Sequence, residues 1–147
     1  MDAIETLLAI EEVRAVKARY FRCVDTKDWA GFAALFAEDA LFDISDDVPG
    51  GVIRGRAAIV EAASTPLARC RSVHHGHCPE VEILSPTEAR AIWAMEDILR
   101  WDDDDPAAPL RRLHGFGHYH ESYEKRDGRW LITTMKLTRL IVDHEPR

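Results

Sequence analysis

The spacing of apolar residues divides the chain into a helical first part and a sheet-forming second part. Between residues 3 and 25, apolar side chains recur at intervals of three and four, which predicts an amphipathic helix. Asp2 and Glu5 form a capping-box-like pair at the start of this helix. Shorter helices are predicted over 29–36, where Asp28 can cap the first turn, and over 56–63, after Gly55.

From residue 70 the pattern changes to alternation, which is typical of strands. Long strands are predicted over 72–84, 89–101, 113–126 and 129–142, after one short strand at 40–44. Asp127-Gly128 predicts a tight hairpin of the favoured type, and Gly115 and Gly117 are expected bend points. Helices followed by an antiparallel meander indicate an α+β fold, with one domain over 1–147. Three helices packed on a strongly curved sheet would form a cone with an apolar interior suited to a small molecule.

Composition narrows the partners of this domain. The formal net charge of −7 argues against nucleic-acid binding, which needs a basic face. No apolar run approaches the ~20 residues of a membrane span, and the acidic N-terminus is unlike a signal peptide. The three cysteines show no C-x-x-C spacing, which favours a reducing compartment. We therefore expect a cytoplasmic protein that binds a small molecule, with no nucleic-acid or membrane partner.

Histidines are concentrated at the start of the strand 72–84. His75 and His77 share one face of this strand, and His74 and Gly76 share the other. A metal site would need further ligands, and no second cluster of matching pattern is evident, so no metal is expected. One inward histidine facing one inward aspartate would be enough for a general base, because the carboxylate fixes the tautomer and raises the basicity of the ring.

Asp25 ends a helix that is otherwise committed to packing. Its carboxylate could turn to solvent, pair with a histidine, or cap the next turn. Tyr20 lies five residues earlier, ~140° away around the helix, so the two side chains would flank a cavity from different directions. On the strand 113–126, two sets of residues lie on opposite faces, and either set could line the pocket: His114, His118 and His120 on one face, Tyr119 and Tyr123 on the other.

Several segments together resemble a known family. They are RYFRCVDTKDWAGFAALFAEDALFD, SVHHGHCPEVEIL, ARAIWAMEDI and GHYHESYEKRDGRWLITTMKLTR. They resemble, over nearly the whole chain, the SnoaL-like domains of the nuclear transport factor 2-like superfamily, whose fold is a cystatin-like α+β cone. The chain looks most similar to the branch that contains scytalone dehydratase, bile-acid dehydratase and hexachlorocyclohexane dehydrochlorinase. Enzymes of that branch use an Asp–His dyad to remove a proton from an activated carbon, without a cofactor.

The resemblance implies roles for particular residues. The family aspartate falls on Asp25, and the family histidine on His74, with His75 as second choice. Tyr20 matches a tyrosine that could donate a hydrogen bond to a leaving hydroxyl or a carbonyl. Arg139 is a looser match to an arginine on the last strand, and Cys78 stands where the family often has Asn. The residues expected to bind the substrate are Trp93, Met95, Phe36, Ile53, His75, His118 and Arg139.

The expected activity is that of a cofactor-independent lyase, dehydratase-like or isomerase-like, acting on an apolar, polycyclic or terpenoid-like substrate. Two other interpretations stay open at this point. The same fold also serves as a non-catalytic ligand-binding module, and as the small structural subunit of ring-hydroxylating dioxygenases. An open curved sheet leaves an apolar outer face to cover, so we also expect a homo-oligomer, either a dimer or a trimer.

Overall fold

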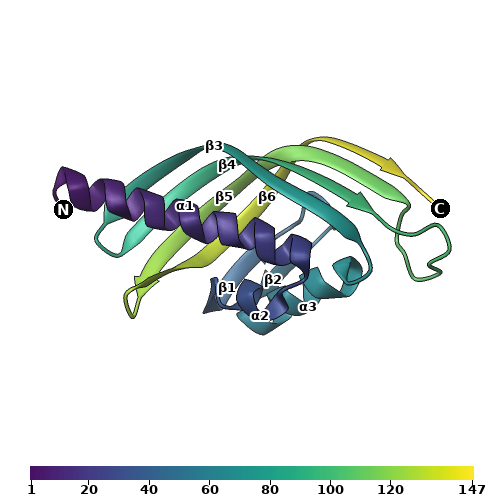
Figure 1. Cartoon of the computed structure of the whole chain (residues 1–147), viewed down its shortest axis with the longest axis horizontal. Helices are drawn as coiled ribbons and strands as arrows, with labels where there is room; N and C mark the ends of the chain where they lie inside the picture. Colours follow the sequence, from purple (N-terminus) through teal and green to yellow (C-terminus); the bar gives the residue numbers. More distant parts are fainter.

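A long helix lies across one face of a curved, unclosed sheet in the computed structural model, which describes residues 1–147 (Figure 1). The helices are α1 (Ala3–Thr26), α2 (Trp29–Ala33) and α3 (Arg56–Leu67). The strands are β1 (Phe36–Asp43), β2 (Val52–Arg54), β3 (Arg71–Ser85), β4 (Glu88–Arg100), β5 (Arg112–Arg126) and β6 (Arg129–Glu145). The predicted α+β fold, three helices on a curved sheet, is confirmed.

The order of strands differs from a simple meander. Across the sheet the order is β2-β1-β6-β5-β4-β3, and β1 pairs with β6 in parallel. The prediction of a wholly antiparallel sheet was wrong at this pair. The second helix also ends at Ala33 instead of residue 36, because Phe36 already pairs with Ile132 on β6. The short strand β2 was missed, since its neighbourhood reads as a turn in the sequence.

Helix α1 begins and ends at specific hydrogen bonds. The Asp2 carboxylate accepts from the Glu5 backbone N–H at 2.8 Å, and the Glu5 carboxylate accepts from the Asp2 N–H at 2.8 Å, so the predicted capping box is present. Lys27 ends the helix in the left-handed conformation, with φ of 62°. The first turns extend beyond the sheet (Figure 1), and Leu7, one of the apolar residues of the predicted amphipathic helix, is 63% exposed. The last turn, which carries Asp25, packs against β3.

The core fills the space between α1 and the inner face of the sheet. Its largest fully buried side chains are those of Tyr123, Lys17, Phe32, Phe36, Ile59, Ile132, Met135, Val13 and Val24. The β5–β6 hairpin turns at Asp127 and Gly128, whose φ values of 50° and 76° give the favoured turn in which both residues are left-handed. None of the helices is both long and apolar enough to span a bilayer.

Candidate active site

His74 lies on the inner face of the sheet, at the point where β3 pairs with β4. It is directly opposite Asp97, and both side chains are buried, with exposed fractions of 8% and 3%. The neighbouring positions on each strand, His75 and Glu96, point to the outer face, because side chains alternate along a strand. The inner position therefore belongs to His74, the first choice of the sequence analysis.

The carboxylate of Asp25 binds His74 in two ways. One oxygen lies 2.7 Å from the ring Nδ1, and the other accepts the His74 backbone N–H at 2.8 Å. Ser72, two residues earlier on the same face of β3, donates to the first oxygen at 2.9 Å and accepts from the Lys27 ammonium at 2.7 Å. The carboxylate is thus fixed against the strand, and Nδ1 of the ring carries its proton toward Asp25. This leaves Nε2 as the nitrogen that can accept a proton.

These contacts shift the titration of Asp25. Burial acts to raise its pKa, but hydrogen bonds from the His74 ring, the His74 backbone N–H and Ser72 outweigh burial and hold the pKa below its usual range. Asp25 is therefore ionised at neutral pH. A charged carboxylate is the form that can stabilise a positive charge on the adjacent imidazole.

The lowered pKa predicts how Asp25 contributes to stability. Because the folded-state pKa lies below the unfolded value of about 3.9, the contribution is complete above that pH and is lost as the pH falls through the folded value. We expect Asp25→Asn to lower the free energy of unfolding by about 1.5–3 kcal/mol at pH 5 and above, the range for hydrogen bonds to a charged group. Urea unfolding of both proteins between pH 5 and pH 3 should show this difference shrinking. A difference that stays constant or grows in acid would contradict the assignment.

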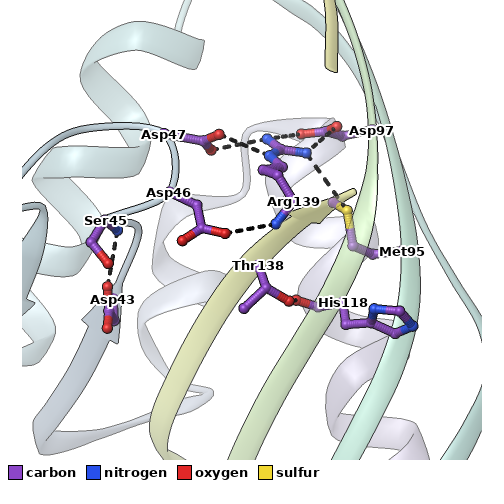
Figure 2. A network of polar contacts seen from close by, with 9 residues as sticks. All are labelled: Asp43, Ser45, Asp46, Asp47, Met95, Asp97, His118, Thr138 and Arg139. Atoms are coloured by element: carbon purple, nitrogen blue, oxygen red, sulfur yellow. Dashed lines mark hydrogen bonds and ion pairs between the residues drawn. The ribbon is translucent and has the colours of Figure 1, made fainter. Parts of the chain in front are cut away.

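A second ionic group lies beside the pair, centred on Arg139 (Figure 2). Its guanidinium makes two hydrogen bonds to Asp97, at 2.8 and 2.9 Å, and two to Asp47, at 2.8 and 3.0 Å. Asp46 accepts the Arg139 backbone N–H at 2.9 Å. Burial acts to lower the pKa of Arg139, but the two carboxylates outweigh it and raise the pKa above its ordinary value. The loop between β1 and β2 is thereby tied to the inner face, and Arg139 stays charged.

Gly115 makes the close approach of this group possible. It pairs with Asp97 on the neighbouring strand, and a Cβ placed on it would collide with both the Asp97 carboxylate and the Arg139 guanidinium. We expect Gly115→Ala to lower the free energy of unfolding by about 1–3 kcal/mol, the usual cost of overpacking a well-packed interior. Equilibrium unfolding in urea measures the change. Unchanged stability would mean that the two charged groups are free to move apart.

Two tyrosines place their hydroxyls close to these charges. Tyr20 on α1 and Tyr119 on β5 are both buried, with ring centroids 5.9 Å apart. Burial is the main cause that raises the pKa of Tyr20, and the charges of Glu121, Asp97 and Asp25 add to it. Burial likewise raises the pKa of Tyr119, together with Tyr20 and Asp97. Both hydroxyls therefore keep their protons at neutral pH and can donate hydrogen bonds.

The polar groups form one layer between two apolar clusters. On the inner face of β4, Asp97 stands between Met95, which belongs to the main core, and Leu99, which belongs to a smaller cluster. That smaller cluster consists of Cys70, Leu99, Trp101 and Ala108. We call the layer of Asp25, His74, Asp97 and Arg139 the interior polar layer. Its charges sit in surroundings that are apolar on both sides, where electrostatic effects on a bound molecule are strong.

The other residues expected at the site are placed differently. Trp93 and Met95 lie on the inner face; Trp93 donates to Tyr123 at 3.3 Å, and Arg139 contacts the Met95 sulfur at 3.7 Å. Phe36 is fully buried in the core, and Ile53 packs at its edge. His75 and His118 lie on the outer face, and Figure 2 shows the His118 ring directed away from Arg139. His75 and His118 therefore do not belong to a site built around His74.

The expected open cone is filled by side chains around His74. The Phe21 ring lies against Gly76, one inner-face position beyond His74, and Trp93 packs on the same spot. The largest of the three main grooves, about 620 Å³, lies on the outer face, where Glu82, Arg90, His120 and Lys136 help to line it. None of these three grooves includes His74 or Asp25.

Sequence reasoning missed three members of this arrangement: Asp47, Ser72 and Asp97. A usable signal existed for Asp97, because it continues the inward alternation of Trp93 and Met95 and is the only acid on that face of β4. No comparable signal marked Asp47, which reaches Arg139 from a loop more than ninety positions away in the chain.

The chain is an α+β protein of the nuclear transport factor 2-like fold. The model of the SnoaL-like domain matches residues 5–136, and the chain belongs to that family. Among solved structures, the chain is similar to a variant of Rv3472, a protein of unknown function from Mycobacterium tuberculosis. The identity is 27% and the TM-score 0.75, covering 91% of this chain and 77% of that one.

Two further structures share the fold at lower identity. One is a proposed scytalone dehydratase from Novosphingobium aromaticivorans, 21% identical, with a TM-score of 0.81 and coverage of 99% of this chain and 97% of that one. The other is a type 3 hexachlorocyclohexane dehydrochlorinase from Novosphingobium barchaimii, 14% identical, with a TM-score of 0.81 and coverage of 97% and 94%. At these identities the likeness shows the fold alone.

Proposed function

We propose that this protein is a cofactor-independent lyase in which His74 removes a proton from an activated carbon of a small, largely apolar molecule. The observation that carries the proposal is the 2.7 Å contact between Asp25 and Nδ1 of a buried His74. An imidazole held in this way presents an unprotonated Nε2, and the adjacent carboxylate stabilises the imidazolium that forms. Relatives described as dehydratase and dehydrochlorinase share the fold and support the same class.

The residues divide the chemical step between them. Nε2 of His74 takes the proton, and the electron pair of the broken C–H bond forms the new double bond. The leaving group on the adjacent carbon departs with its own bonding pair. If that group is a hydroxyl, Tyr20 donates a hydrogen bond to it, and the proton that His74 has taken passes to the hydroxyl, which leaves as water and returns His74 to its neutral form. Arg139, charged and fixed by two carboxylates, stabilises negative charge that develops on a carbonyl next to the activated carbon.

The surroundings of His74 indicate the kind of substrate. The inner face next to the interior polar layer offers Trp93, Met95 and Phe21, which favour an apolar ring system over a charged metabolite. The polar part of the molecule would contact Tyr20 and Arg139. We infer an apolar, ring-containing carbonyl compound with a hydroxyl or another leaving group one carbon beyond the acidic C–H. We retain the expectations of a cytoplasmic location and a homo-oligomer as part of this proposal.

Proton removal can be tested before the natural substrate is known. A panel of cyclic β-hydroxy ketones is incubated with the protein in D₂O, and ¹H NMR follows both loss of water and exchange of the acidic C–H. We expect exchange or elimination for at least one member, at a rate that is ~10²–10⁴-fold lower in His74→Ala. Tight binding without exchange, retained in the variant, would instead identify a ligand-binding module.

A further inference from the structure

The outer face of the sheet carries a second cluster directly behind the interior polar layer. His75 and His77 come from β3 and Glu96 from β4, and the ligating atoms of all three lie within 4.8 Å of one another. Both histidines are exposed, and Glu96 is partly exposed. Two imidazoles and one carboxylate are a donor set that suits a divalent transition metal such as zinc.

Strand register explains why these three side chains meet. His75 is paired with Glu96, and His77 is paired with Ala94, the next outer-face position of β4. Residues two apart on a strand share a face, so both rings project beside the same carboxylate. The two rings have centroids 5.9 Å apart. No metal was expected here from the sequence, because the third ligand comes from a different strand.

A third histidine fixes the carboxylate of Glu96. Nε2 of His114, on β5, lies 2.7 Å from one oxygen of Glu96, and Nε2 of His77 lies 3.6 Å from the other oxygen. A hydrogen bond of this kind orients the carboxylate and leaves its second oxygen toward the histidine pair. Such supporting contacts are characteristic of metal ligands, and they raise affinity by limiting the motion of the ligand.

We propose that His75, His77 and Glu96 bind one divalent ion of the zinc class, with the fourth tetrahedral position open. Magnesium and calcium are disfavoured, because they require several oxygen ligands and the cluster offers one carboxylate. The bound ion would connect β3 to β4 behind the opposed pair of His74 and Asp97. This site is independent of the proposed lyase activity, because its side chains lie on the other face of the sheet.

Isothermal titration calorimetry with zinc chloride tests the site directly. We expect one ion per chain, and no binding of magnesium chloride or calcium chloride under the same conditions. His77→Ala and Glu96→Gln should each weaken zinc binding by more than tenfold. His114→Ala should weaken it by ~10-fold, as for supporting residues in other metal sites. His77 is 53% exposed as a side chain, so its replacement should leave the fold intact, which circular dichroism checks.

The chain supplies a matched control for this experiment. His118 and His120 are also two apart on the outer face of a strand, with ring centroids 6.1 Å apart, but they do not belong to a three-ligand group. The double variant His118→Ala/His120→Ala should bind zinc like the parent protein. Absence of saturable binding, or equal loss in the control and in the cluster variants, would overturn the proposal.

Discussion

Replacing His74 with alanine is expected to slow proton removal by ~10²–10⁴-fold, the usual contribution of a positioned general base. The fold should persist, because the ring lies at the boundary of the core and Asp25 keeps its bonds to Ser72 and to the backbone of residue 74. Initial rates on a substrate identified from the ketone panel give the comparison. His120→Ala, on the outer face, serves as the control and should keep the parent rate.

Asp25 and His74 should act as a unit in proton removal. Asp25→Asn removes the charge that stabilises the imidazolium and allows the wrong tautomer of His74. We expect it to slow the same step strongly, and we expect the double variant with His74→Ala to be no slower than His74→Ala alone. If the rate reductions of the two single variants multiply in the double variant, Asp25 acts separately from His74, for example only as a structural anchor between α1 and β3.

The largest expected effect on stability is at Lys17. Its side chain is fully buried, and its ammonium forms a hydrogen-bonded ion pair with the buried Glu121. The same ammonium lies 3.8 Å from the ring centroid of Tyr20 and 3.6 Å from that of Tyr119. Burial lowers the pKa of Lys17 to about 8, and Glu121 opposes that shift. The Lys17 ammonium thus contacts the rings of Tyr20 and Tyr119, the two tyrosines that lie next to the interior polar layer.

Lys17→Met keeps most of the volume but leaves the Glu121 carboxylate buried without its counter-charge. We expect the free energy of unfolding to fall by about 3–5 kcal/mol, the cost of removing one partner of a buried pair. The double variant Lys17→Met/Glu121→Gln should recover at least half of this loss, because no charge remains buried and Tyr123 keeps a hydrogen-bond acceptor. Urea unfolding at neutral pH measures all of these values.

A surface pair provides the comparison for Lys17. Lys125 lies 2.9 Å from Glu12, and both side chains are partly exposed. Lys125→Met should cost no more than about 1 kcal/mol, as is typical for exposed ion pairs. If Lys17→Met lowered the free energy of unfolding as little as Lys125→Met, the carboxylate of Glu121 would have to be neutral or hydrated in the folded protein.

The sequence predicted most of the fold because local signals agreed with the tertiary structure. The capping box at Asp2, the Asp127-Gly128 turn and the alternation along β4 and β5 all correspond to observed features. The wrong predictions concern segments whose structure depends on pairing with residues far away in the sequence. Phe36 reads as part of a helix, but it becomes a strand residue because β6 offers a partner.

The face of each histidine could not be read from alternation alone. Val81 and Ile83 point inward, and counting back by twos would also turn His77 and His75 inward. The structure has one extra residue in β3 between His77 and Glu80, at Cys78 and Pro79, and this bulge reverses the alternation. Cys78 has a φ of 38°, a left-handed value that marks the irregularity. Only the family resemblance favoured His74, and the bulge supplies the physical reason.

The position of the ring proton on His74 shows whether Asp25 leaves Nε2 free to accept a proton. Nitrogen-15 NMR of the histidine ring, recorded where the imidazole is neutral, distinguishes the two tautomers. We expect the proton on Nδ1, held by Asp25, and a shift toward the other tautomer in Asp25→Asn. A proton found on Nε2 in the parent protein, or a tautomer that does not respond to Asp25→Asn, would contradict it.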